Sequence, residues 1–172
     1  MKPCIFLDID GVINPSNRQA QYKIDYSLPD KIAKEKNNPK IAKLNMYLVN
    51  QVYYNFNEES ITYIHKLIEE FNASIIITSS WRIIFSLEEL QALFSIFDLG
   101  QYIQGTTQII SPRMDAIQSY IDKYQIKQYL ILDDFDMSSV FNYRFIYVHN
   151  YFKKDDYQSA RYALSIQLGE KK

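Results

Sequence analysis

The amino-acid sequence predicts an α/β fold, a three-layer domain built around a central parallel sheet of five strands. Two observations predict it. The chain has 172 residues, an ordinary size for one domain, and short apolar runs alternate along it with longer amphipathic segments. Such alternation is typical of parallel strands joined by crossover helices that cover both faces of the sheet. The expected strands are residues 4–7, 74–77, 101–103, 129–132 and 145–148.

Capping patterns predict where the crossover helices begin. Asn57, followed by two glutamates, is a favourable helix start, and Ser86 with Glu89 has the spacing of a capping box. Pro112 suits the first position of a third helix, and a last helix is expected over residues 155–168. With right-handed crossovers, the carboxyl ends of all the strands lie at one edge of the sheet.

The region between the first and second strands breaks the alternation. Prolines at positions 15, 29 and 39 divide short helix-like pieces, and an aromatic stretch follows over residues 47–56. We interpret residues 15–56 as a small insertion after the first strand and not as a separate domain. Residues 1–172 are therefore expected to form a single domain.

Composition excludes several classes of protein. Nineteen Lys and Arg nearly balance twenty Asp and Glu, so charge does not favour nucleic acid or an anionic membrane as a partner. The single Cys4 excludes an internal disulfide and a cysteine metal cluster. No apolar run approaches the roughly 20 residues that span a bilayer, and the start of the chain does not resemble a secretory signal. We expect a cytoplasmic protein without a membrane segment.

Four acids follow two of the expected strands. Asp8 and Asp10 come directly after the first strand, where Gly11 allows a tight turn, and Asp133 and Asp134 end the fourth. Ligands of open α/β sheets bind at this edge. Carboxylates that meet there repel one another unless a cation lies among them, and a hard divalent ion such as Mg²⁺ prefers oxygen ligands.

Two other roles for these acids are less consistent with the sequence. Any one of them is more often a turn former or helix cap, but four acids at two strand ends are not well explained in that way. A calcium loop of the EF-hand type is excluded, because placing Gly11 at its sixth position puts Phe6 and Asn17 where acids are required.

Groups that suit phosphate are expected at the same edge. Thr78 and Ser79 follow the second strand, and their hydroxyl and backbone N–H groups can donate to phosphate oxygens. Arg113, near the start of the third helix, can place its charge on a phosphate or on an acid. Trp81 is expected to pack in the core.

In order along the chain, these residues resemble the four motifs of the haloacid dehalogenase (HAD) superfamily of phosphohydrolases, which implies a Rossmann-like, HAD-like domain. Motif I corresponds to DIDGVIN at 8–14, motif II to Thr78 or Ser79, motif III to Arg113, and motif IV to Asp133 and Asp134. The segments TSSWR, RMDAI and LILDDFD are similar to a bacterial and phage branch of that superfamily that includes RNA-repair-like domains.

The resemblance implies a role for each residue. Asp8 would be the nucleophile that forms an aspartyl-phosphate, and Asp10 the general acid and base. The Asp8 carboxylate, the Asp10 carbonyl oxygen, Asp133 and Asp134 would hold Mg²⁺. Thr78 or Ser79, together with Arg113, would bind the transferring phosphate.

A large lid over the site is not expected, because the insertion is small, so an accessible phosphate on a macromolecule is the expected substrate. Protein phosphotyrosine is preferred, and a nucleotide or nucleic-acid-end phosphatase is the alternative. The aromatics Tyr47, Tyr53, Tyr54 and Phe56 either stack on a substrate ring or form the insertion's own core. The non-enzymatic alternative is a phosphate-binding or receiver-like module.

Overall fold

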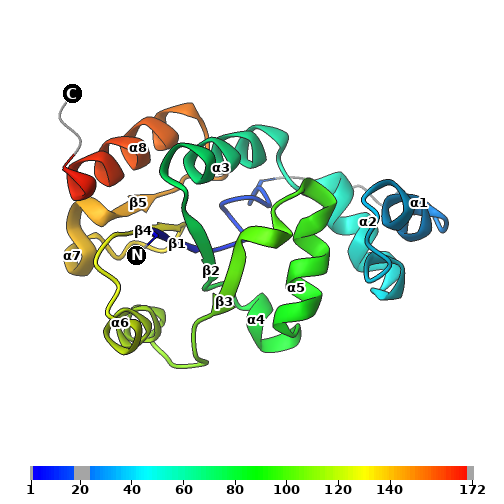
Figure 1. Cartoon of the computed structure of the whole chain (residues 1–172), viewed down its shortest axis with the longest axis horizontal. Coiled ribbons are helices and arrows are strands. Elements are labelled where there is room, and N and C mark those ends of the chain that lie inside the picture. Colours follow the sequence, from blue (N-terminus) through cyan, green and yellow to red (C-terminus); the bar gives the residue numbers. More distant parts are fainter. Residues whose placement is uncertain (1, 18–23, 170–172) are drawn as a thin grey trace.

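A computed structural model of the chain describes residues 2–17 and 24–169. Its five parallel strands form one sheet in the order β3-β2-β1-β4-β5 (Figure 1). The predicted α/β fold and five-stranded parallel sheet are confirmed. The strands are β1 (Cys4–Leu7), β2 (Ser74–Ile77), β3 (Ile103–Thr106), β4 (Tyr129–Asp133) and β5 (Phe145–Tyr147).

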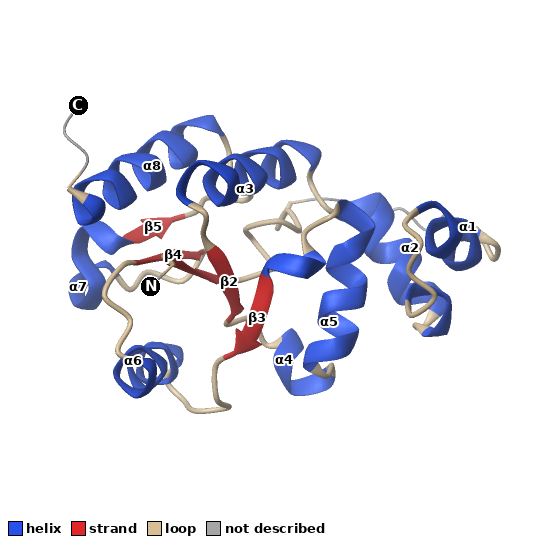
Figure 2. Cartoon of the chain, in the orientation of Figure 1, coloured by secondary structure: helices blue, strands red, loops and turns tan. Residues whose placement is uncertain are grey.

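Helices cover both faces of this sheet and give the three layers (Figure 2). Apolar side chains of α3, α5 and α8 pack in one buried cluster, and those of α6 and α7 pack in a second. The helices that follow the region between β1 and α3 are α3 (Glu58–Phe71), which precedes β2, and then α4 (Trp81–Ile84), α5 (Leu87–Phe94), α6 (Arg113–Tyr124), α7 (Ser138–Phe141) and α8 (Lys154–Leu168), with 3₁₀ turns η2 (Ser95–Phe97), η3 (Gly100–Tyr102) and η4 (Asn142–Arg144).

The predicted helix caps are present. Asn57 accepts a hydrogen bond from the backbone N–H of Ser60 at the start of α3. Ser86 accepts from the Glu89 N–H, and Glu89 accepts from the Ser86 N–H, as the capping box requires. The helix start predicted at Pro112 is one residue too early. Pro112 has an extended backbone and is the N-cap, and α6 begins at Arg113.

The third strand was predicted too early in the sequence. Residues 100–102 form the 3₁₀ turn η3, and β3 begins at Ile103. This edge strand reads IQGT and has no apolar run to mark it. Gly105 suits the position, because the Tyr120 hydroxyl lies 2.9 Å from where a Cβ would stand. The strand is therefore placed by its pairing with β2 and by tertiary packing, and not by an apolar pattern of its own.

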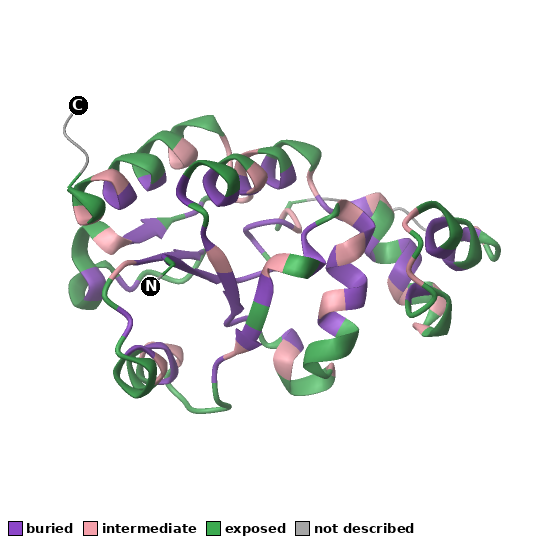
Figure 3. Cartoon of the chain, in the orientation of Figure 1, coloured by how far each residue is buried: buried purple, intermediate pink, exposed green. Residues whose placement is uncertain are grey.

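Alternation along the strands decides which residues reach the site. In β1, Ile5 and Leu7 belong to the cluster with α3, whereas Cys4 and Phe6 belong to the cluster with α6. Because successive side chains point to opposite faces, the next residue, Asp8, falls on the α6 side. Figure 3 shows that the strands of the sheet are largely buried.

The insertion between β1 and α3 contains α1 (Leu28–Glu35), η1 (Ile41–Lys43) and α2 (Met46–Asn55). Its buried side chains, including Ile32 and Val52, belong to the same apolar cluster as α3 and α5. Residues 18–23 of the predicted insertion lie outside the described residues. Among the helices that the structure does describe, none is long and apolar enough to cross a lipid bilayer.

Candidate active site

The hydrogen-bond ladder of the sheet continues one residue past the strands and aligns three polar residues. The Asp8 N–H donates to the Leu132 carbonyl at 3.0 Å, and the Thr78 N–H donates to the Leu7 carbonyl at 3.0 Å. Leu7 is level with Ile77 on one side and Leu132 on the other. Asp8, Thr78 and Asp133 therefore form a row across three neighbouring strands, on the α6 side of the sheet.

The two acids of this row lie close to a third carboxylate, that of Asp134. Each of Asp8, Asp133 and Asp134 has one carboxylate oxygen that lies within 4.8 Å of such an oxygen in the other two. Asp8 is 3% exposed and Asp133 is fully buried, whereas Asp134 is exposed. A set of oxygen donors at this spacing fits a hard divalent cation, and Mg²⁺ is the ion that commonly pairs with carboxylates and a phosphate.

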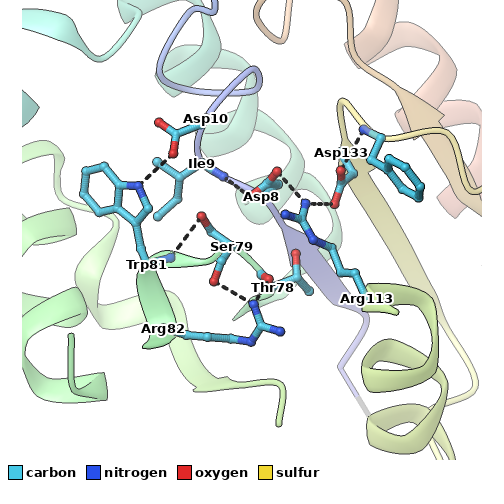
Figure 4. Close-up of polar contacts among 10 residues, drawn as sticks. Asp8, Ile9, Asp10, Thr78, Ser79, Trp81, Arg82, Arg113 and Asp133 are labelled. Atoms are coloured by element: carbon cyan, nitrogen blue, oxygen red, sulfur yellow. Dashed lines mark hydrogen bonds and ion pairs between the residues drawn. The ribbon is translucent and has the colours of Figure 1, made fainter. Parts of the chain in front are cut away.

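Arg113 supplies the positive charge of this cluster. It is the first residue of α6, and its Nη1 donates to Asp8 Oδ2 and Asp133 Oδ2, both at 2.6 Å (Figure 4). Burial opposes the charged form of the guanidinium, but the two carboxylates outweigh burial and raise the pKa of Arg113. The side chain is therefore a fixed positive charge next to Asp8.

Asp133, the last residue of β4, and Asp134, which follows it, both have a pKa above the ordinary value of an aspartate. Burial, aided by the charge of Asp8, raises the pKa of Asp133 to about 6 even though Arg113 opposes the shift. Burial and the charge of Asp8 also raise the pKa of Asp134. Negative charge is thus in excess here, which is the condition that a bound cation relieves.

Asp10 lies apart from the three-carboxylate group. Its Oδ2 accepts a hydrogen bond from Trp81 Nε1 at 2.9 Å, and its Oδ1 accepts from Asn14 Nδ2 at 2.7 Å. Figure 4 shows the Asp10 carboxylate directed toward the indole, away from Arg113. The two acids of the first motif therefore have different surroundings, one among charges and one among neutral N–H donors.

A tight turn after β1 produces this separation. The N–H of Gly11 donates to the Asn14 carbonyl at 2.7 Å, and the Asn14 N–H donates to the Ile9 carbonyl at 2.9 Å. Gly11 has a φ of 79°, in the left-handed region, and a Cβ at this position would collide with the Asp134 carboxylate. Glycine is needed here both for the turn and for the space that Asp134 occupies.

The two candidates for motif II differ in their surroundings. The Thr78 hydroxyl is buried and has no hydrogen-bond partner within the described residues, whereas Ser79 Oγ accepts from the Trp81 N–H at 3.4 Å. Thr78 also lies in the row with Asp8. These observations favour Thr78 as the hydroxyl that meets a phosphate, because a buried polar group without a partner is unusual.

Arg82 and Thr107 were not predicted for the site. The Arg82 guanidinium donates to the carbonyls of Thr78, Ser79, Thr107 and Gln108, which ties the loop after β2 to the loop after β3. The Thr107 hydroxyl is buried and, like that of Thr78, has no partner in the described part of the chain. Arg82 could have been found from its place in the segment TSSWR, which follows the second strand. Thr107 was missed because it follows β3, the strand that was predicted too early.

Two of the cavities that the insertion helps to line include residues predicted for the site or for its substrate. The smaller, about 350 Å³, is lined by Asp10, Asn14, Gln51 and Asp134 among others. The larger, about 850 Å³, is lined by three of the predicted aromatics, Tyr53, Tyr54 and Phe56, and does not include the acids of the site.

The four aromatics thus have different environments. Phe56 is buried and packs on Phe97 and Trp81, which is a core role. Tyr47 and Tyr53 are 56% and 44% exposed.

Comparison with known families identifies the chain. A family model described as the HAD domain in Swiss Army Knife RNA repair proteins matches residues 4–153. The chain belongs to this family. Searches of curated proteins and of solved structures found no match to it. The resemblance noted from the motifs is confirmed, and membership supports a phosphatase of the HAD type. The match includes every residue of the three-carboxylate group, Asp10 and Arg113.

We predict that Gly11→Ala abolishes the arrangement of the acids. The new Cβ collides with Asp134 and also strains a left-handed backbone, so divalent-cation binding, measured by calorimetry, should weaken at least about tenfold. Gly169→Ala is the matched control, because Gly169 has a φ of 71° with open space around it. That control should lose about 1–2 kcal/mol of stability and keep its affinity for the cation. Equal cation affinity in both variants would contradict the prediction.

We predict a pH dependence of stability that is specific to Asp133 in the metal-free protein. Its pKa rises from 3.8 to about 6 on folding, so its contribution to stability is fully present below the lower value and is lost as pH rises through the higher one. The free energy of unfolding of wild type, relative to Asp133→Asn, should therefore fall over that window in urea titrations. Saturating Mg²⁺ should reduce the fall, because the cation competes with the proton.

Asp25→Asn provides the control for this titration. Hydrogen bonds from Ser27 and Lys31 lower the pKa of Asp25 to about 2, so its contribution is complete above the ordinary value of 3.8. Its difference from wild type should stay nearly level while that of Asp133→Asn changes. A level difference for Asp133→Asn between pH 3.8 and about 6 would contradict the prediction, because it would show that folding does not raise the pKa of Asp133.

Proposed function

We propose that this protein is a Mg²⁺-dependent phosphomonoester hydrolase that forms an aspartyl-phosphate on Asp8. The observation that carries the proposal is the position of Asp8. It is a buried carboxylate at the edge of the sheet, 2.6 Å from the Arg113 guanidinium and grouped with Asp133 and Asp134. A nucleophile, a fixed positive charge and a cation-binding group are thus brought together in a HAD-family chain.

The reaction consists of two displacements at phosphorus. In the first, an Asp8 carboxylate oxygen bonds to phosphorus, the bond to the leaving oxygen breaks, and Asp10 gives its proton to that oxygen. In the second, a water oxygen bonds to phosphorus, one water proton passes to Asp10, and the bond to Asp8 breaks. Inorganic phosphate leaves, and both acids return to their starting states.

The polar and charged groups around Asp8 have two further roles, which are phosphate binding and cation binding. Arg113 and the Thr78 hydroxyl bind the oxygens of the transferring phosphoryl group. Asp8, Asp133, Asp134 and the Asp10 carbonyl oxygen would hold Mg²⁺, which would neutralise negative charge on the phosphate. Without such an ion the incoming phosphate would meet an excess of carboxylates.

For the substrate we propose a phosphate at the end of an RNA strand. The family is described by its place in RNA repair proteins, and the cavity next to Asp10 is lined by polar side chains such as Asn14 and Gln51. Amide groups suit the hydroxyls and base edges of a nucleotide. Protein phosphotyrosine is the second candidate, favoured by the balanced charge of the chain and by the aromatic lining of the larger cavity.

We predict that the purified protein hydrolyses p-nitrophenyl phosphate only with Mg²⁺. Asp8→Asn should lower the rate by about 1,000-fold or more, because no covalent intermediate can form. Asp10→Asn should lower it less on this substrate, whose leaving group departs without a proton. Trapping of a phosphorylated chain in wild type, but not in Asp8→Asn, would identify the intermediate by mass. Wild-type activity in Asp8→Asn would exclude the covalent mechanism.

We predict that the two candidate substrates respond to different variants. Gln51→Leu, in the cavity beside Asp10, should raise KM for an RNA oligonucleotide with a terminal phosphate about tenfold and leave p-nitrophenyl phosphate unaffected. Tyr53→Leu, in the larger cavity, should leave the RNA substrate unaffected. If a phosphotyrosine peptide is instead the better substrate and Tyr53→Leu impairs it, the second candidate is correct.

A further inference from the structure

The chain's single tryptophan contacts the proposed general acid and base directly. We propose that Trp81 and Asn14 are positioning residues that hold the Asp10 carboxyl group in place for proton transfer to the leaving oxygen and from the attacking water. This inference rests on the proposed function, since it assigns no role to Trp81 if Asp10 does not act on a leaving group. It goes beyond it by naming the two side chains that place Asp10.

The two hydrogen bonds restrain the carboxyl group at both oxygens. Trp81 Nε1 donates to Oδ2 at 2.9 Å and Asn14 Nδ2 donates to Oδ1 at 2.7 Å. Asp10 is exposed, so without these bonds its side chain would be free to rotate in solvent. Each carboxylate oxygen can accept a second bond, so one contact per oxygen leaves capacity for a substrate or a water.

Trp81 is itself held firmly. It begins α4, is 8% exposed, and its ring packs between Phe56 and Phe85, at centroid distances of 6.0 and 5.7 Å. Phe56 in turn stacks on Phe97 at 5.8 Å. The indole N–H is a donor with one direction, and packing fixes that direction toward Asp10.

Asn14 is held by the turn that carries Asp10. Its backbone N–H donates to the Ile9 carbonyl and its carbonyl accepts from the Gly11 N–H, so residues 10 and 14 face each other across a short bridge. The smaller cavity, which both residues line, opens beside the carboxyl group. A leaving group in this cavity would lie next to the free side of Asp10.

A simpler explanation is that Asp10 merely satisfies the buried indole N–H. The two explanations differ in their effect on catalysis. A structural loss at Trp81 would slow the hydrolysis of every phosphate ester alike. Loss of a positioned acid would slow esters whose leaving group needs a proton, such as an alkyl phosphate, much more than p-nitrophenyl phosphate.

The experiment compares kcat/KM, which reports the first displacement and not the second step that all esters share, for glycerol phosphate and p-nitrophenyl phosphate in Trp81→Phe and Asn14→Asp. Trp81→Phe keeps the ring but removes the donor, and Asn14→Asp replaces a donor by an acceptor of the same shape. Each variant should lower kcat/KM on the alkyl ester about tenfold or more beyond its effect on the aryl ester. Phe85→Leu, which loosens the packing that directs the indole N–H, should also impair the alkyl ester more than the aryl ester.

Combination with Asp10→Asn tests whether Trp81 acts through Asp10. In that background Trp81→Phe should cause no further selective loss on the alkyl ester. Additive losses, or equal losses on both esters in the single variants, would overturn the proposal while leaving the hydrolase function intact. A wild-type protein that hydrolyses neither ester would instead overturn the hydrolase function.

The contact can be tested independently of activity. Because the chain has one tryptophan, its indole N–H gives a single resonance in a ¹H–¹⁵N spectrum. Asp10→Asn and Asn14→Asp should both shift this resonance, whereas Asp25→Asn, on the insertion, should not. An indole resonance that does not respond to Asp10→Asn would overturn the proposal whatever the protein hydrolyses.

Discussion

The register of β1 with its two neighbours is the constraint on which the site depends. Leu7 is level with both Ile77 and Leu132, so the residues that follow, Asp8, Thr78 and Asp133, emerge side by side and on one face. A slip of one residue would turn each of these side chains to the opposite face of the sheet. The apolar residues of the strands fill two separate cores and hold this register, so packing far from the proposed phosphate site fixes the geometry of that site.

Charge is nearly balanced over the whole chain but not within the site. Three carboxylates meet one guanidinium, and Arg113 contacts two of those carboxylates through a single nitrogen. The third, Asp134, lies against Gly11 and completes the group from the exposed side. Burial alone would favour protonated acids, and Arg113 only partly offsets this for Asp133. Such a site is suited to exchange a proton for a cation, and then to accept a phosphate dianion that neither burial nor Arg113 alone could balance.

The parts of the fold and site that follow from strand ends could be predicted from the sequence. Asp8 and Asp133 were found because each ends an apolar run, and parallel topology brings such ends together. The edge strand β3 was misplaced because its sequence, IQGT, carries no apolar run, and Thr107 was missed with it. The bonds of Asn14 and Trp81 to Asp10 could not be predicted, since they depend on the path of a turn and on the direction of one indole N–H. The sequence indicated only that Trp81 would be buried, which is true of its ring.

The short helix α4 carries side chains that contact both the proposed acid and base, Asp10, and the loop of the proposed phosphate-binding residue Thr78. Trp81 and Arg82 are adjacent, yet Figure 4 shows their side chains directed to different parts of the site. Trp81 reaches the proposed acid and base, whereas Arg82 binds the carbonyls that shape the loop carrying Thr78. The last aromatic of the insertion, Phe56, packs on the Trp81 ring, so the insertion supports the position of Asp10 from behind. If Asp10 acts as proposed, this contact gives the insertion a part in the chemistry that needs no closing movement, because Phe56 supports the ring whose N–H restrains the exposed Asp10 carboxyl group.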